Sequence, residues 1–219
     1  MGKRGPKPKR VVSEKWTPEL AYAIGLLATD GGLSPRVYLI DLTSKDREQL
    51  ENYRRCLNIS TPITKKWSGA GNQYLRVQFK NVFFYNFLIS VGLTPAKSKT
   101  LGPVTIPDKF FFDFLRGVFD GDGCTYSYFD PRWRSSFMIY SSVASSSPDF
   151  IVWLQKTIAE RLSIRGHITT TPKKHYQLRY AKTESLKLLK KMYRRYDCVC
   201  LSRKRLKIEK MLGIIGESL

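Results

Sequence analysis

The chain has 219 residues, of which 42% are hydrophobic and 13% aromatic, enough apolar material for one large or two small globular domains. Its 38 Lys and Arg outnumber its 18 Asp and Glu, and the formal charge of +20 favours a polyanionic partner, most often nucleic acid. The sequence contains no apolar run of 18 residues and no signal-peptide pattern, which argues against a membrane span and against secretion.

Cysteine and histidine usage narrows the expected compartment and the type of metal site. The four cysteines form no Cys-x-x-Cys pair, so we expect reduced thiols in a prokaryotic cytoplasm or nucleoid, or in an organellar matrix. Only two histidines are present, His167 and His175, so a site that needs several His ligands is hard to build. Any metal is therefore expected to be held by oxygen atoms.

The first predicted elements run in chain order from a basic arm into a helix. Residues 1–16 contain Gly, Pro and basic residues without an apolar repeat, and are predicted to be a disordered or DNA-contacting arm. Thr17 and Pro18 are typical of a helix start, and Gly31 and Gly32 of its end. The patterns that follow predict a strand over 36–43, a helix over 45–57, strands over 61–67 and 72–80, and a helix over 82–93.

Residues 105–219 repeat the order of elements found in residues 17–104. The second set comprises a helix over 108–123, strands over 124–129 and 135–142, a helix over 147–162, strands over 166–172 and 176–181, and a helix from Thr183. Short segments also correspond, since "YLRV" at 74–77 is matched by "QLRY" at 177–180. The sequence thus predicts an α+β monomer with a duplicated αββαββα half and a pseudo-twofold axis, which suits a two-stranded target.

Two of the predicted helices carry small residues at intervals that place them on one face. Such residues allow two helix backbones to approach closely. Two unrelated, tightly packed core helices would show the same pattern, so the small residues alone do not decide the matter. The residues concerned are Ala21, Gly25, Ala28 and Thr29 in the first helix, and Gly117 and Gly121 in the second.

Asp30 and Asp122 each stand five residues after a glycine of these stripes, at the C-terminal end of the helix. The helix dipole disfavours a carboxylate there by up to about 1 kcal/mol, and packed helices would also bring the two carboxylates together. A hard cation such as Mg²⁺ would offset this repulsion, with the carbonyl oxygens of Thr29 and Gly121 as further ligands. On a basic body, such a site suggests phosphodiester hydrolysis. A simple helix cap would explain the glycines but not the aspartates.

The segments "AIGLLATDG" at 23–31 and "LRGVFDGDG" at 115–123 resemble the two signature helices of the LAGLIDADG homing endonucleases, in their single-chain form with two motifs. The resemblance covers roughly residues 17 to 210. It implies the LAGLIDADG fold, in which the signature helices meet at the pseudo-twofold axis. It also implies two antiparallel, saddle-shaped sheets that straddle the major groove of DNA.

The resemblance also implies roles for particular residues. Asp30 and Asp122 match the metal-binding catalytic acids, with Mg²⁺ as cofactor, Mn²⁺ as a substitute and Ca²⁺ supporting binding without cleavage. Asp120 matches an acidic position that is not the main ligand, where the first copy has Ala28. Basic residues near the metals are expected in the segments after each half's last strands and helix. The candidates are Lys97, Lys99, Arg203 and Lys204, with ordinary surface charge as the alternative.

Alternation along the predicted strands separates an apolar face from a polar one that is suited to reading DNA. In residues 73–80, Arg76, Gln78 and Lys80 share the polar face. Arg pairs well with guanine and Gln with adenine in the major groove. For any one residue, simple exposure to solvent is the alternative. The candidate DNA contacts are Arg36, Tyr38, Lys65, Arg76, Gln78, Lys80, Tyr126, Tyr128, Arg132, Arg134, Gln177 and Arg179.

Taken together, the motifs predict a sequence-specific DNA endonuclease that breaks both strands of a long, asymmetric duplex site, one strand per aspartate. The same fold also serves RNA maturases that assist intron splicing and DNA-binding proteins that have lost cleavage. The presence of both Asp30 and Asp122 favours the enzyme, because a protein that only binds has little use for two mutually repelling acids.

Overall fold

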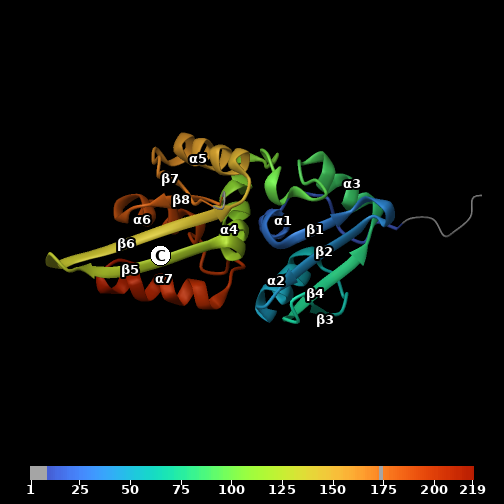
Figure 1. Ribbon diagram of the computed structural model, residues 1–219, viewed down its shortest axis with the longest axis horizontal. Helices are drawn as coiled ribbons and strands as arrows, with labels where there is room; N and C mark the ends of the chain where they lie inside the picture. The colour runs from blue at the N-terminus through green and yellow to red at the C-terminus, as the bar shows by residue number, and fades with distance from the viewer. Residues whose placement is uncertain (1–8, 173–174) are drawn as a thin grey trace, which may run out of the picture.

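The computed structural model describes residues 9–172 and 175–219, apart from the side chain of Arg134, and divides the chain into two similar halves (Figure 1). The N-terminal half comprises α1 (Pro18–Asp30), β1 (Gly31–Ser34), β2 (Leu39–Ser44), α2 (Arg47–Leu57), β3 (Thr64–Trp67), β4 (Gln73–Lys80) and α3 (Val82–Ser90). The C-terminal half comprises α4 (Phe111–Asp122), β5 (Gly123–Asp130), β6 (Trp133–Ser145), α5 (Pro148–Leu162), β7 (His167–Thr170), β8 (Tyr176–Tyr180), α6 (Lys182–Met192) and α7 (Ser202–Ile214).

Each half contains one four-stranded antiparallel sheet, with strand orders β1-β2-β4-β3 and β5-β6-β8-β7. One face of each sheet packs against the helices, where Leu42, Val77 and Leu178 are fully buried. The other face is open, and we call it the open face of that half. The predicted α+β architecture, a duplicated αββαββα unit, is confirmed.

Local sequence signals explain where the helices of the N-terminal half begin. The Thr17 hydroxyl accepts a hydrogen bond of 3.1 Å from the Leu20 amide, with Pro18 at the first helical position of α1. The Asp46 carboxylate caps α2 by accepting from the Glu48 amide, and the Asn81 amide oxygen caps α3. The caps of α2 and α3 fix the points at which β2 and β4 turn into the helices that follow them.

Residues 9–16 of the predicted disordered or DNA-contacting arm are ordered and pack against the N-terminal half. Val12 is 3% exposed, and the Trp16 ring meets the Phe87 ring edge-on at 5.6 Å. The Asn81 side-chain amide also donates to the Lys9 carbonyl, at 3.0 Å. Residues 1–8 of the predicted arm lie outside the described part of the chain.

The C-terminal half has one helix more than the duplicated unit requires. α7 packs against the covered face of the β5–β6 hairpin, where Met211 contacts Phe137 and Ile139. This hairpin, with 13 residues in β6, projects well beyond the body of the molecule (Figure 1). The added helix therefore supports a strand pair that has no equally long counterpart in the N-terminal half. Within the described residues, no helix has the length and apolar character needed to cross a bilayer.

Candidate active site

The two halves meet along α1 and α4, whose backbones approach closely at the predicted small residues. A Cβ atom built on Gly25 would lie 2.2 Å from the Phe114 carbonyl oxygen, and one on Gly117 would lie 2.1 Å from the Tyr22 carbonyl oxygen. Neither position has room for a side chain, because the atoms it would meet belong to the opposite backbone. Farther along, a Cβ on Gly121 would clash with the Thr29 hydroxyl. Ala21 and Ala28 are buried in the same core.

Asp30 and Asp122 are the last residues of α1 and α4, so this contact brings them to neighbouring positions. Both are open to solvent, although protein surrounds them on several sides. Burial and then the nearby charge of Asp30 raise the pKa of Asp122 to about 6. Burial also raises the pKa of Asp30, against the effect of a 3.0 Å hydrogen bond from the Gln49 amide. The two carboxylates therefore lie close enough to interact electrostatically.

Two of the four candidate basic residues lie beside these aspartates, one from each half. Lys97 is 6% exposed and donates to the carbonyl of Gly31, the residue after Asp30. Lys204 donates to the carbonyl of Gly123, the residue after Asp122, at 2.7 Å. Burial lowers the pKa of Lys97 to about 8 and also lowers the pKa of Lys204, while the aspartates oppose both shifts. Both ammonium groups are thus held at matching positions next to the carboxylates.

The other two basic candidates lie differently. Lys99 is exposed, in the same short 3₁₀ turn as Lys97. Arg203 is exposed on α7 and forms a 2.7 Å ion pair with Asp46 at the start of α2. Neither side chain therefore occupies a position equivalent to that of Lys97 or Lys204. Chain order alone does not distinguish the members of each pair, because their separation depends on how the segment turns.

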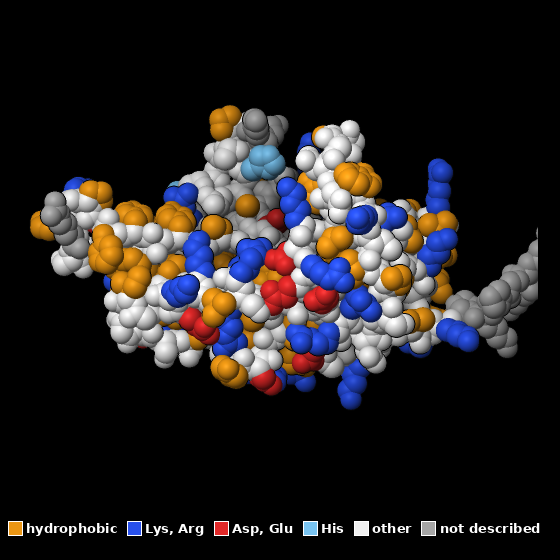
Figure 2. Space-filling model, turned by 90° about the horizontal axis from the view of Figure 1, so that it is seen from below, with side chains coloured by type: hydrophobic (Ala, Val, Ile, Leu, Met, Phe, Trp, Pro, Cys, Tyr) orange, Lys and Arg blue, Asp and Glu red, His pale blue; other side chains and the backbone are white. Residues whose placement is uncertain are grey.

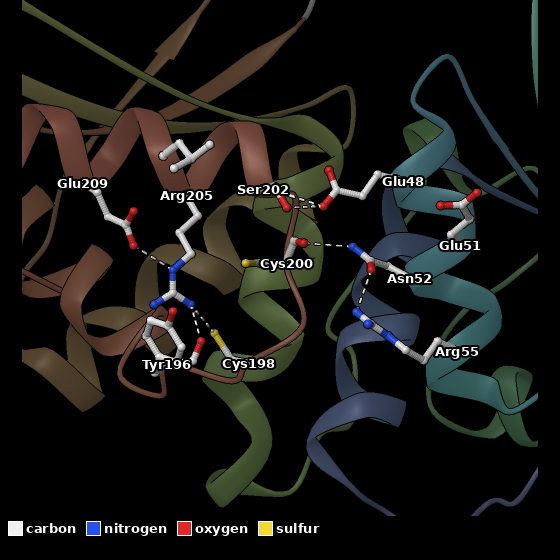
Figure 3. Close-up of a pocket in the computed structure, with 11 residues that line it drawn as sticks. Glu48, Glu51, Asn52, Arg55, Tyr196, Cys198, Cys200, Ser202, Arg205 and Glu209 are labelled. Atoms are coloured by element: carbon white, nitrogen blue, oxygen red, sulfur yellow. Dashed lines mark hydrogen bonds and ion pairs between the residues drawn. The ribbon is translucent and has the colours of Figure 1, made fainter.

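The connection between α6 and α7 leads into the helix that bears Lys204, and it is tied to the N-terminal half. The Asn52 amide of α2 donates to the Cys200 carbonyl at 2.9 Å, and the Ser202 amide donates to the Glu48 carboxylate at 3.0 Å. Figure 3 shows these side chains of α2 facing the connection across a groove. A reciprocal bond of 2.6 Å runs from Ser147, at the start of α5, to the Leu101 carbonyl. The segment before Lys204 and the segment after Lys97 thus each reach the opposite half near the start of a helix.

Asp120, the acidic position without a catalytic assignment, anchors this connection from inside the core. It is 1% exposed and accepts hydrogen bonds of 2.7 Å from the Tyr22 hydroxyl and 2.8 Å from the Leu201 amide. Tyr22 belongs to α1, whereas Leu201 immediately precedes α7. One buried carboxylate therefore joins both halves and fixes the start of the helix that bears Lys204.

The open face of the N-terminal half carries most of the polar residues predicted there. Arg76 and Gln78 lie opposite Thr43 and Asp41 of β2. The pairing of β3 with β4 places Lys65 opposite Leu75, hence on the covered side of the sheet. Lys65, a candidate DNA contact, therefore does not share the face of Arg76. The neighbouring Lys66 occupies that face instead, where its ammonium group donates to the Thr43 hydroxyl at 3.0 Å.

The alternation pattern predicted a strand that begins at Arg36 and includes Tyr38, but the structure has no strand at these two residues. A 3₁₀ turn spans Pro35–Val37, and β2 begins only at Leu39. Tyr38 has φ near 50°, in the left-handed region, and its ring meets Tyr85 edge-on at 5.5 Å. Pro35 favours a turn at this point, a local preference that overrides the strand-like residues after it.

The C-terminal open face brings together four of the predicted DNA contacts, Tyr126, Tyr128, Gln177 and Arg179. Arg132 lies in the β5–β6 turn instead of in a strand, and pairs with Asp130 at 3.1 Å. Arg134 lies in β6, but its side chain is outside the described part of the structure. Figure 2 shows Lys and Arg side chains surrounding a small acidic group near the middle of the molecule.

The donor atoms near Asp30 and Asp122 are suited to a hard cation. The described residues contain no group of three or more His, Cys, Asp and Glu that could hold a metal by themselves. Two carboxylates with the terminal carbonyls of Thr29 and Gly121 supply only oxygen donors, as Mg²⁺ prefers. Such a set is incomplete, so water and phosphate oxygens would have to supply the remaining ligands.

No known family model matches the chain, and no curated protein matches it either. Among solved structures, the meganuclease I-SmaMI bound to uncleaveable DNA superposes with a TM-score of 0.63 at 12% identity, over 92% of this chain and 93% of its own. The chain has the LAGLIDADG homing endonuclease fold. The homing endonuclease I-LtrWI bound to target DNA gives a TM-score of 0.57 at 12% identity, over 90% of this chain and 89% of its own.

A second kind of protein shares the LAGLIDADG homing endonuclease fold. The N-terminal LAGLIDADG domain of DUF199/WhiA has a TM-score of 0.54 at 13% identity, over 94% of this chain and 98% of its own. The chain spans 62% of the length of full-length DUF199/WhiA from Thermatoga maritima. At such low identities the comparisons give the fold alone, so activity has to be argued from the site.

Proposed function

We propose that the protein is a divalent-metal-dependent DNA endonuclease that breaks both strands of a specific duplex site. The observation that carries this proposal is the pairing of Asp30 and Asp122 at the touching ends of α1 and α4, close enough for one charge to raise the pKa of the other. Two repelling carboxylates at helix C-termini destabilise the protein unless a cation binds them. The solved structures of I-SmaMI and I-LtrWI, which share this fold, contain DNA.

In this proposal, Asp30 and Asp122 would hold the cation, and the backbone carbonyls before them would complete its protein ligands. A bound Mg²⁺ would supply an activated water and would stabilise the leaving oxygen. Lys97 and Lys204 stand beside the carboxylates and would offset the negative charge that develops on the phosphate. The pKa of Lys97 is about 8, so the ammonium form still predominates at pH 7.

The two open faces would bind the DNA on either side of this centre. They belong to sheets of a protein with formal charge +20. The N-terminal face presents Arg76, Gln78 and Lys66 in one layer. Neutralising phosphates releases counterions, so affinity should fall steeply as salt is raised.

The test is selection of cleaved sites from a randomised duplex library with the full chain and Mg²⁺. We expect one long, asymmetric site to be cut on both strands. Asp30→Asn and Asp122→Asn should each lower cleavage of at least one strand about a thousandfold or more, while specific binding in Ca²⁺ persists. Lys99→Met, which changes an exposed charge, is the matched control.

Two outcomes would contradict the endonuclease proposal. A library left uncut while a specific duplex is bound would make the protein a DNA-binding protein of this fold. Tight, specific binding of structured intron RNA with no duplex preference would assign it to the maturases instead.

A further inference from the structure

The open face of the C-terminal half carries a row of stacked tyrosine rings. Tyr140 stacks against Tyr126 with ring centroids 5.0 Å apart and planes 13° from parallel. It stacks against Tyr128 at 6.1 Å and 11°. The Arg179 guanidinium lies 5.9 Å from the Tyr126 centroid. We call Tyr126, Tyr128 and Tyr140 the tyrosine row.

The strand register places the tyrosine row on the open face. Tyr126 and Tyr140 are direct partners across β5 and β6, and they share their face with Arg179 of β8. The opposite face of the same hairpin carries Phe137 and Ile139, which pack against α7. The row therefore lies on the projecting hairpin, along which Figure 2 shows hydrophobic side chains.

Stacking determines which part of each ring is free to contact a ligand. Mutual stacking takes up ring faces and leaves ring edges and hydroxyl groups outward. Binding of single-stranded bases requires open ring faces on which bases can stack. Ring edges that point outward instead suit the floor of the major groove, where their C–H groups can contact the C5 methyl of thymine, the apolar group on display. The row is therefore better suited to duplex DNA than to an unpaired strand.

The polar residues beside the row are already engaged with one another. Arg179 donates to the Gln177 amide oxygen at 3.0 Å, and the Gln177 amide donates to the Ser142 hydroxyl at 3.0 Å. Within the described residues, Arg76, Gln78 and Lys80 of the N-terminal half have no hydrogen-bond partner for their side chains. Arg76 and Arg179 each keep an unpaired Nε, but the N-terminal face offers further free polar groups in Gln78 and Lys80, whereas on the C-terminal face the tyrosine row lies beside Arg179.

We propose that the tyrosine row is a specificity determinant that reads thymine methyl groups in the DNA half-site beneath the C-terminal sheet. This inference rests on the proposed function, since it takes duplex DNA as the ligand. It divides recognition between the halves. Hydrogen bonds to base edges would read one half-site, and van der Waals contacts with methyl groups would read the other.

The test uses the full chain in Ca²⁺ and duplexes selected from a randomised library. The half-site whose base preferences change in Arg76→Ala is assigned to the N-terminal half. Thymines of the other half-site are then replaced by deoxyuridine, which lacks only the methyl group. We expect affinity to fall about fourfold per contacted thymine, the equivalent of about 0.8 kcal/mol for one buried methyl-sized group. The same replacement in the N-terminal half-site should change affinity less than twofold.

Substitutions in the row complete the test. Tyr140→Ala should remove the sensitivity to deoxyuridine, and Tyr140→Phe, which keeps the ring edge, should retain it. Thermal unfolding of both variants checks that the fold is intact.

A C-terminal half-site without thymine preference, or a Tyr140→Phe variant that loses the preference, would overturn the inference. If the protein cleaves DNA but the C-terminal half-site shows no thymine preference, the proposal for the tyrosine row fails and the endonuclease proposal stands. Thymine-dependent binding without cleavage would refute only the endonuclease function, and selection of no duplex would refute both.

Discussion

The two halves share one scaffold, yet they surround their aspartates differently. Gln49 of α2 donates to Asp30 at 3.0 Å, and Gln49 in turn accepts from the Ser44 hydroxyl at 2.7 Å. Among the described residues, no side chain donates a hydrogen bond to Asp122, whose pKa is raised to about 6. The duplicated helices thus fix where the acids lie, whereas the surroundings of each acid have diverged.

The lysines offer the largest test of whether the two halves are equivalent. Lys97→Met and Lys204→Met should each slow cleavage about a hundredfold to a thousandfold, because each removes one charge beside the reacting phosphate. The pseudo-twofold axis predicts that the two variants spare opposite strands, and the rate of nicking of each labelled strand measures this. Lys99→Met, in the same turn as Lys97, should leave both rates unchanged. Equal loss on both strands would mean that the two centres act as one.

Substitutions on the α1 side and on the α4 side of the contact between these helices should destabilise the protein equally. Gly25→Ala and Gly117→Ala each place a methyl group against the opposite backbone, and should lower the free energy of unfolding by about 3 kcal/mol. Urea denaturation of the purified variants measures the effect. Gly213→Ala is the matched control, since a Cβ there meets nothing within 4 Å and alanine favours a helix. A loss in only one of the two variants would show that the contact is less symmetric than the structure indicates.

Gln49 should matter to one strand only. Gln49→Leu keeps the side-chain size but removes the donor to Asp30, so cleavage of one strand should fall about tenfold, as for residues that orient metal ligands. The ratio of the two nicking rates is the measurement, because a general loss of stability would lower both equally. Glu51→Gln, exposed on the same helix, serves as the control. An unchanged ratio would show that the bond to Asp30 has no role in cleavage.

The smallest contrast concerns cysteines, one from each half. Burial raises the pKa of Cys56 to about 12, so it stays a thiol at neutral pH. A hydrogen bond from Cys200, with the charges of Arg116 and Arg205, lowers the pKa of Cys198. Cys198 is therefore a thiolate at pH values at which an ordinary cysteine is still a thiol. Because the thiolate is the nucleophile, iodoacetamide at pH 7.5 should label Cys198 at least about tenfold faster than Cys56.

Peptide mapping by mass spectrometry gives both labelling rates. Cys200→Ala is the control, since it removes the hydrogen bond that lowers the pKa of Cys198 and should slow the labelling of that residue. Equal labelling of Cys56 and Cys198 in the unchanged protein would contradict the assignment.

Sequence patterns predicted what depends on local spacing and missed what depends on how segments meet. The interval from Gly25 to Asp30 and from Gly117 to Asp122 was enough to predict the packed helices, because small residues and helix ends are local features. Whether Lys65 or Lys66 lies on the open face depends on the register of the short strand β3. Only the pairing of β3 with β4 fixes that register.

Gln49 and Asp120 show the same limit from inside the protein. Gln49 is 3% exposed on an amphipathic helix, where the sequence gives no sign that it contacts an aspartate 19 residues earlier. Asp120 bonds to Tyr22 and Leu201, 98 and 81 residues away along the chain. A polar residue in an apolar helix face signals a buried partner, but only the tertiary structure identifies it.

The long hairpin supported by α7 bears on the duplex site that we propose the protein binds. The 13 residues of β6 span about 43 Å when extended, whereas the eight residues of β4 span about 26 Å. At about 3.4 Å per base pair, the difference of about 17 Å corresponds to roughly five base pairs. The break would therefore fall off-centre in the protected duplex, with the longer arm of contacts on the side of the C-terminal half.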